Sequence, residues 1–139
     1  MEHTYGKIVK KFCEELHLPK PHAFCQDWEI EVADLLRIQE FINYYQEKKL
    51  NNREKEVLME IIINSCDDAL QNGTLNENNW RKVAEILIVD RDIHDKTIDY
   101  WILEDVEDKE ECFVITPLIR RVKEEIMEIE SIEKELFDM

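Results

Sequence analysis

The sequence has little glycine and serine, and this scarcity limits the chemistry that the chain can support. Only two of its 139 residues are glycine and only two are serine. Gly6 and Gly73 are isolated, so no glycine-rich loop is available to hold a phosphate group. Neither Ser65 nor Ser131 lies in the glycine-flanked turn that presents a catalytic serine. These absences argue against nucleotide-binding and acyl-transfer enzymes. Since no other active site is evident in the sequence, we predict that the protein is not an enzyme and needs no cofactor.

A long apolar run is also missing. No stretch approaches the roughly 18 uninterrupted apolar residues that a membrane span requires, and residues 1–18 lack the apolar centre of a signal peptide. These observations predict a cytoplasmic protein with no membrane partner. In that compartment its cysteines are expected to be reduced thiols.

Basic residues are outnumbered by acidic ones. The chain has 33 acidic and 18 basic residues, a formal net charge of -15. Such a charge repels the phosphates of nucleic acid and anionic lipid, and it favours basic protein partners. We therefore expect no nucleic-acid binding, although an acidic protein can imitate nucleic acid.

Apolar residues make up 44% of the chain and recur from Tyr5 to Phe137. A chain of this length and composition can bury one core, so we expect a single domain over residues 1–139. The apolar residues repeat at spacings of three and four, which predicts an all-α fold. We expect five or six helices in antiparallel pairs, arranged as a bundle or a short solenoid.

Most of the expected helices have recognisable start or stop signals. The first helix ends before Pro19, and the second runs from an Asp27 N-cap to about Lys49. The third runs from about Arg53 to Gln71, with Gly73 as its left-handed stop. A fourth is capped by Asn76, and the last begins at Thr116-Pro117 with threonine as N-cap. The last helix has one apolar face, formed by Ile119, Val122, Ile126, Ile129, Ile132 and Leu136.

The segment between residues 93 and 115 has two interpretations. Asp95 can cap a short helix in which Ile98, Trp101 and Ile102 have helical spacing. The alternative is a small hairpin around residues 100–115, because Phe-Val-Ile at 113–115 is a good strand former. We prefer the helix and keep the hairpin as the alternative.

An acidic segment, Glu104–Glu111, separates two apolar flanks. Six of its eight residues are acidic and only Lys109 is basic. Burial would remove the hydration of these carboxylates with almost no partner to replace it. The flanks, residues 98–103 and 113–115, are expected to dock into the core and to hold the acids in water. This arrangement predicts a surface that meets a basic partner.

Three cations follow the acidic segment, in the first turns of the last helix. Arg120, Arg121 and Lys123 lie where the helix dipole disfavours positive charge. Their natural partners are the acids just upstream, since residues 93–111 carry a formal net charge of -6. We hypothesise that the arginines tether part of the acidic segment and leave the rest unpaired for a ligand.

Cysteine and histidine gather near the N-terminus at Cys13, His17, His22 and Cys25. Thiolate and imidazole are ligands that Zn²⁺ prefers, and four of them could close around one ion. The spacing matches no known zinc motif, a thiol beside an apolar helix face is usually part of the core, and histidines near helix ends are usually surface residues. We therefore predict that the purified protein holds no stoichiometric zinc.

The acidic segment and its flanks carry a family resemblance. Together with Tyr100-Trp101 and residues 113–120, they make the chain similar to the small immunity proteins of bacterial toxin systems, which include contact-dependent growth inhibition and related polymorphic toxins. The resemblance implies a protein that binds a toxin domain, often a basic nuclease, and blocks its active site.

We predict one-to-one binding of such a toxin domain, with the acids steering the encounter and Trp101 or a neighbouring aromatic residue as the anchor. The predicted toxin-binding residues are Trp101, Glu104, Asp105, Glu107, Asp108, Glu110 and Glu111. A helical adaptor or an acidic nucleic-acid mimic would explain the same acidity. A metal-dependent enzyme is the remaining alternative, and it needs either the cysteine and histidine cluster or the pair of Glu14 and His17 to be occupied.

Overall fold

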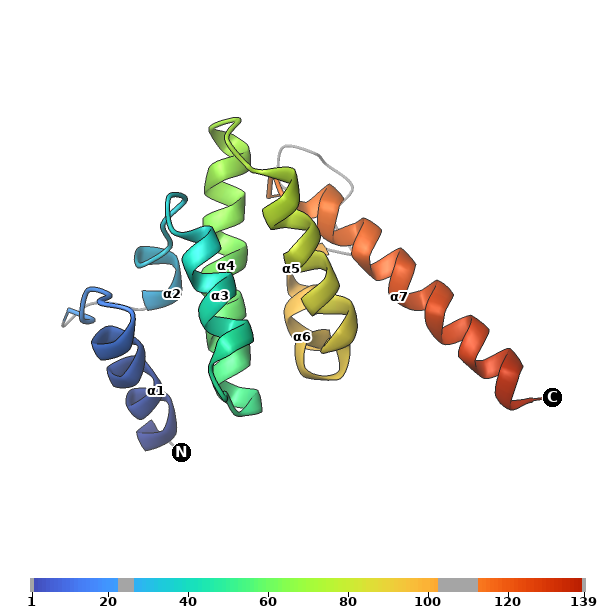
Figure 1. The fold of residues 1–139 in the computed structure, drawn as a ribbon, viewed down its shortest axis with the longest axis horizontal. Coiled ribbons are helices and arrows are strands. Elements are labelled where there is room, and N and C mark those ends of the chain that lie inside the picture. The colour runs from blue at the N-terminus through green and yellow to red at the C-terminus, as the bar shows by residue number, and fades with distance from the viewer. Residues whose placement is uncertain (1, 23–26, 103–112, 139) are drawn as a thin grey trace. The chain divides into compact units, whose positions relative to one another are not determined.

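The structure is a computed structural model that describes residues 2–22, 27–102 and 113–138. These residues form seven helices and no strand, so the all-α prediction is confirmed (Figure 1). The helices are α1 (Glu2–Glu15), α2 (Trp28–Glu31), α3 (Ile38–Glu47), α4 (Asn52–Gln71), α5 (Glu77–Val89), α6 (Arg91–Ile102) and α7 (Thr116–Phe137). The chain divides within α4 into an N-terminal unit, Met1–Ser65, and a C-terminal unit, Cys66–Met139. The described residues form seven helices where five or six were expected, because the expected second helix is divided into α2 and α3. The antiparallel pairing and the single domain stay predictions.

The first helix forms as predicted. α1 ends at Glu15, before Pro19, whose carbonyl accepts a hydrogen bond of 2.8 Å from the Trp28 indole. The Phe12 ring meets Tyr44 of α3 edge to face, with 5.8 Å between the ring centroids. The apolar face of α1 lies in the core and consists of Ile8, Val9, Phe12 and, just after the helix, Leu16.

The predicted helix from Asp27 to Lys49 is wrong, because the chain leaves helical geometry between α2 and α3. The N–H of Asp34 donates to the buried Ser65 hydroxyl of α4 at 2.9 Å, and the Asp34 carboxylate accepts from the N–H of Leu36 at 2.9 Å. These bonds form a turn in place of the helical ladder. Asp27 precedes α2, but its side chain makes no capping hydrogen bond. The break could not be predicted locally, because Ser65 lies 31 residues beyond Asp34.

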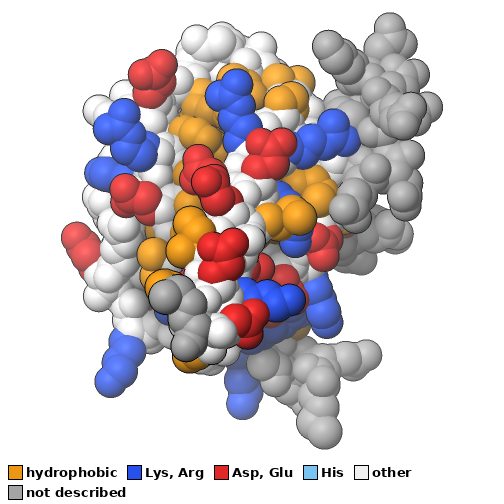
Figure 2. Space-filling model, turned by 90° about the vertical axis from the view of Figure 1, so that its right-hand side faces the viewer, with side chains coloured by type: hydrophobic (Ala, Val, Ile, Leu, Met, Phe, Trp, Pro, Cys, Tyr) orange, Lys and Arg blue, Asp and Glu red, His pale blue; other side chains and the backbone are white. Residues whose placement is uncertain are grey.

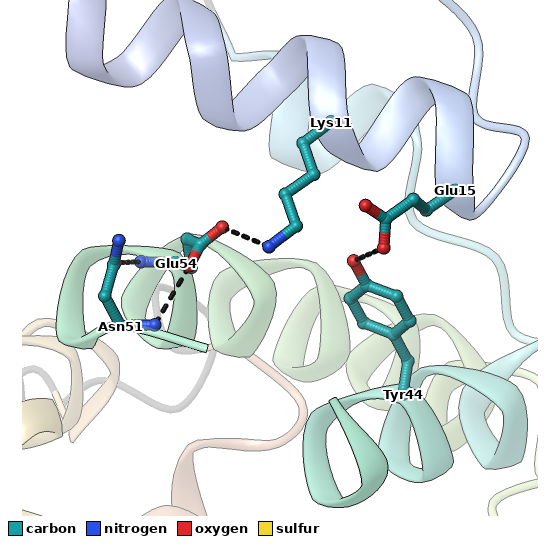
Figure 3. A network of polar contacts seen from close by, with 5 residues as sticks. All are labelled: Lys11, Glu15, Tyr44, Asn51 and Glu54. Atoms are coloured by element: carbon teal, nitrogen blue, oxygen red, sulfur yellow. Dashed lines mark hydrogen bonds and ion pairs between the residues drawn. The ribbon is translucent and has the colours of Figure 1, made fainter. Parts of the chain in front are cut away.

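A buried carboxylate, Glu54, lies in the first turn of α4 and connects this helix to α1 (Figure 3). It accepts from the N–H of Asn51 at 2.9 Å, and the Asn51 side chain accepts from the N–H of Glu54 at 2.8 Å, which makes a reciprocal capping box. Lys11 of α1 donates to Glu54 at 2.7 Å, and nearby Tyr44 donates to Glu15 at 2.6 Å. Burial alone would raise the pKa of Glu54, but the Asn51 hydrogen bond and Lys11 outweigh it and lower the pKa.

The end of α4 and the start of α5 follow the predicted signals. Gly73 has a φ of 70°, and the N–H groups of Gly73 and Thr74 donate to the carbonyls of Leu70 and Ala69. This is a Schellman stop, and its left-handed residue favours glycine. The Asn76 side chain then caps α5 by accepting from the N–H groups at positions 78 and 79, at 2.8 and 3.2 Å. Both predicted signals are confirmed.

The helix preferred for residues 98–102 is confirmed, but its predicted start is wrong. α6 begins at Arg91, because the Asp90 carbonyl already accepts from the N–H of His94, so Asp95 lies inside the helix. Residues 100–102 belong to α6 and residues 113–115 form no strand, so the described residues contradict the hairpin. α5, α6 and α7 pack against one another in the C-terminal unit.

α7 begins at Thr116 as predicted, with Pro117 in its first turn. Thr116 is not the N-cap, because its hydroxyl donates to the carbonyl of Trp101 instead of accepting from the backbone of α7. The helix has no side-chain cap at this end. Within the described residues, every helix is too short or too polar to cross a membrane.

Candidate functional site

The candidate site lies in the C-terminal unit, where α6 ends and α7 begins. Six predicted binding residues, Glu104, Asp105, Glu107, Asp108, Glu110 and Glu111, lie outside the described residues. The structure describes the residues that flank their segment, which are the last turn of α6, up to Ile102, and the residues from Phe113 into α7.

Side chains of α7 hold the last turn of α6. The Thr116 hydroxyl donates to the carbonyl of Trp101 at 2.8 Å, and the Arg120 guanidinium donates to the carbonyl of Ile102 at 2.8 Å. Carbonyls at a helix C-terminus have no partner within their own helix, so these bonds satisfy two of them. Trp101, Ile102 and Ile115 are buried, which confirms that both flanks of the acidic segment dock into a core.

A buried aspartate holds the chain just before α7. Asp67 in α4 accepts from the N–H of Ile115 at 2.9 Å, and its second oxygen accepts from Gln71 at 2.9 Å. A buried backbone N–H without a partner would be costly, so Asp67 stabilises this entry to α7. The adjacent Asp68 is more accessible, and burial and the neighbouring Asp67 raise its pKa. Sequence reasoning missed Asp67, since paired acids normally indicate a solvated face.

Aromatic side chains cover the junction. We call Tyr100, Trp101, Phe113 and Val114 the aromatic patch. The ring centroids of Trp101 and Phe113 are 4.4 Å apart, and Tyr100 lies 5.6 Å from Trp101 and 5.8 Å from Phe113. Distances of this kind are typical of favourable aromatic pairs. The patch therefore brings α6 and the residues before α7 together in one apolar surface.

The patch is layered, with Trp101 below and Tyr100 above. Trp101 is 2% exposed, so its ring belongs to the core and supports the patch from inside. Tyr100 is 55% exposed and Val114 is 48% exposed, so these side chains offer the contact area. Ile98 and Trp101 share the buried face of α6, and Tyr100 falls beside that face.

The cations after the acidic segment have several partners among the described residues. Arg120 donates to the Ile102 carbonyl, and Lys123 lies 3.6 Å from Asp99, an acid of α6 just upstream of the segment. Arg121 is exposed. The predicted tether between the arginines and the acids of Glu104–Glu111 concerns residues outside the described ranges, and it stays a prediction.

The described part of the cysteine and histidine cluster does not converge. Cys13 is buried and donates to the Pro19 carbonyl at 3.6 Å, His17 is exposed, and His22 lies 3.1 Å from Glu31. Cys25 lies outside the described residues. No group of three metal-ligating side chains occurs in residues 2–22, 27–102 and 113–138. The absence of zinc from the purified protein stays a prediction.

A groove of about 550 Å³ runs along α1 in the N-terminal unit. Val9, Cys13 and Pro21 contribute apolar walls, and Lys10 and Lys20 lie at its sides. Burial raises the pKa of the Cys13 thiol, although Lys20 acts in the opposite direction. A thiol is nucleophilic as the thiolate, so this shift makes Cys13 a poor nucleophile.

The described residues on either side of the acidic segment form one surface. It combines partly exposed aromatic rings with a backbone that Thr116, Arg120 and Asp67 hold in place. Comparisons with family models, curated proteins and solved structures gave no match.

Proposed function

We propose that this chain is a bacterial immunity protein that acts in the cytoplasm. It binds one basic toxin domain, of the nuclease kind, and blocks the active site of that domain. The observation that carries the proposal is that described residues flanking the acidic segment are bonded to the core beside the aromatic patch. A partner that neutralises these acids would therefore meet exposed aromatic side chains at the same place.

Charge supports a basic partner. The C-terminal unit contains 21 acidic and 9 basic residues, a formal net charge of -12. Opposite charge on a partner raises the association rate, because the field orients the encounter before contact. The acids of Glu104–Glu111 are assigned this steering role.

The aromatic patch supplies the anchor. Partly exposed aromatic side chains that become desolvated on binding often provide most of the binding energy and slow dissociation. Tyr100 is assigned this role together with Phe113, and Trp101 keeps both rings in position from the core. Trp101 was predicted as the direct contact, and Tyr100 takes this role in its place.

Co-expression in bacteria is the decisive experiment. The toxin domain encoded beside the gene of this protein is expressed with the protein and, separately, without it. We expect survival with the protein and death without it. Cells that die equally in both cases would rule out the immunity function, and an adaptor or a nucleic-acid mimic would then explain the acidity better.

Association kinetics test the steering role. Reversal of Glu104, Asp105, Glu107 and Asp108 to lysine should slow association with the toxin domain by at least about tenfold and reduce its dependence on salt. The matched control reverses Glu14, Glu47, Glu85 and Asp95, which are exposed elsewhere, so both variants change the formal net charge from -15 to -7. Equal slowing in the two variants would assign steering to total charge and remove the acidic segment from the mechanism.

Dissociation kinetics test the anchor. Tyr100→Ala should speed release by about tenfold or more, because it removes an exposed ring from the interface. Tyr100→Phe keeps the ring and should release at close to the original rate. If both variants dissociate like the original protein, the aromatic patch is not the contact surface.

A further inference from the structure

α7 carries a second apolar surface, at the end far from the aromatic patch. The helix is 22 residues long, and apolar residues follow a spacing of three and four along one side of it. Ile119, Val122 and Ile126 on this side are buried in the C-terminal unit. The same side continues with Ile129, which is partly buried, and with Ile132 and Leu136, which are 53% and 67% exposed. We call Ile129, Ile132 and Leu136 the C-terminal stripe.

The stripe continues a helix contact that the protein already makes. Ile119, Val122, Ile126, Ile129, Ile132 and Leu136 follow spacings of three and four and form one apolar seam along α7. The first half of this seam lies against the core of the C-terminal unit, while the second half extends beyond the residues that cover the first. The space-filling view in Figure 2 shows hydrophobic side chains at the surface with acidic and basic ones among them. A second helix would complete the seam.

Arg91 neutralises one edge of the stripe. Its guanidinium lies 3.0 Å from Glu133 and 3.5 Å from Glu130, and it also donates to the Ile88 carbonyl at 2.9 Å. Glu133 lies beside Ile132 at the edge of the stripe, and Arg91 offsets its charge there. Arg91 thus reduces the negative charge on this edge of the stripe.

The opposite edge remains acidic. Glu125, Glu128 and Glu135 are exposed and fall at helical spacing beside the stripe. Among the described residues, no ion pair is made by Glu128 or Glu135. Over residues 124–138 there are seven acidic residues and one basic residue, Lys134, a formal net charge of -6. The field along this half of α7 is therefore strongly negative.

We propose that the C-terminal stripe binds a basic amphipathic helix of a partner protein. Such a helix would place apolar residues against Ile129, Ile132 and Leu136 and lysine or arginine against the acidic edge. A second copy of α7 fits poorly, because it would bring seven further carboxylates to the same surface. Anionic membrane also fits poorly, because interfacial helices that bind it are basic.

This inference does not rest on the immunity function, since it uses a different surface of the C-terminal unit. The basic helix that binds the stripe belongs either to the toxin domain or to another protein. In both cases the recognition chemistry is the same, and the occupant is one amphipathic helix with positive flanks. The experiment therefore uses a defined peptide and measures the stripe separately from the aromatic patch.

The probe is a labelled helical peptide of 21 residues in which leucine occupies the heptad a and d positions and lysine most others. Two control peptides are used. The first has the same composition in scrambled order, and the second has glutamate in place of every lysine. Fluorescence anisotropy with the full-length protein should show that the designed peptide binds at least about tenfold more tightly than either control. If the scrambled peptide binds as tightly as the designed one, attraction is only electrostatic and the docking site is excluded.

Variants of α7 locate the site. Ile132→Ser combined with Leu136→Ser should weaken peptide binding by about tenfold or more, because it removes the exposed apolar contacts. Met127→Ser is the matched control, since Met127 is 59% exposed on another side of the same helix, and it should change binding less than twofold. Equal binding by the double variant and the original protein would overturn the proposal.

Two further measurements separate the outcomes. Glu125, Glu128 and Glu135 substituted together by glutamine should weaken binding and reduce its salt dependence, whereas Tyr100→Ala should leave it unchanged. Loss of binding in Tyr100→Ala would assign the peptide to the aromatic patch instead. Sedimentation of the protein alone should show no self-association; a dimer that the Ile132→Ser, Leu136→Ser variant abolishes would identify a second copy as the occupant and overturn the proposal.

Discussion

The N-terminal unit has 12 acidic and 9 basic residues, whereas the C-terminal unit has 21 acidic and 9 basic residues. The formal net charges are therefore -3 and -12. In the N-terminal unit, several acids stabilise the unit itself, as in the pair of Glu54 with Lys11 and that of Glu40 with Arg37. The C-terminal unit has too few cations for its acids.

The helices α1 and α7 show the same contrast in their apolar faces. Phe12 and its apolar neighbours on α1 are buried, so this helix is used for folding. On α7 the face is buried only as far as Ile126, and Leu136 and Phe137 beyond it are 67% and 89% exposed. Two helices with similar amphipathic sequences are therefore covered to different extents, and the extent of the core determines how much of each apolar face is buried.

The largest expected effect comes from removing a core ring of the N-terminal unit. Phe12→Ala should lower the free energy of unfolding by about 3 to 5 kcal/mol, because it leaves a cavity beside Tyr44. Phe137→Ala is the matched control and should change it by less than about 0.5 kcal/mol. Urea denaturation followed by circular dichroism measures both. A large loss in Phe137→Ala would show that the end of α7 is part of a core and would remove the contrast.

The next effect concerns a charge used for folding. Glu54→Gln should cost about 1.5 to 3 kcal/mol at neutral pH, because it weakens the hydrogen bonds with Asn51 and Lys11. The pKa of Glu54 is lowered in the fold from its ordinary value of 4.5, so its contribution is complete above that value and is lost as the pH falls through the lowered pKa.

Unfolding measured between pH 3 and 7 checks the Glu54 prediction. The difference in unfolding free energy between the original protein and Glu54→Gln should be constant above about pH 5 and shrink below about pH 4. Glu14→Gln, which changes an exposed acid of α1, should show neither the loss nor this pH dependence. A difference that grows as the pH falls would contradict the stabilising role of the ionised Glu54.

A charge with a folding role is also expected in the C-terminal unit. Asp67→Ala should cost about 1 to 3 kcal/mol, because the buried N–H of Ile115 loses its acceptor. Asp67→Asn keeps an acceptor oxygen and should recover part of the loss. Amide exchange at Ile115 gives a local measurement, and it should speed in the alanine variant. Unchanged exchange there would show that Asp67 does not hold the entry to α7.

The smallest effect is expected at the edge of the C-terminal stripe. Arg91→Met should lower the free energy of unfolding by less than about 1 kcal/mol, because its pairs with Glu130 and Glu133 are largely exposed and screened. The loss should decrease in high salt, and Arg81→Met, an exposed cation of α5, provides the control. A much larger loss for Arg91→Met would indicate that α7 depends on this cation for folding.

The sequence by itself determined the all-α class and several helix ends, because these depend on local chemistry. The stop at Gly73 and the cap at Asn76 involve hydrogen bonds within a few residues, so they could be predicted without knowledge of the rest of the chain. The docking of both flanks of the acidic segment was also predictable, since the apolar residues and the acids alternate in blocks. The acids themselves lie outside the described residues, and their role remains a prediction.

Only the tertiary structure decided which polar and aromatic groups are buried. Ser65 interrupts the helix predicted from Asp27 to Lys49, and Asp67 holds Ile115, because partners distant in the sequence come within hydrogen-bonding distance. Tertiary packing likewise buries Trp101 and exposes the adjacent Tyr100, and it ends the core halfway along α7. The apolar pattern of a helix shows which side can be buried, but the elements packed against it determine how much of that side is covered.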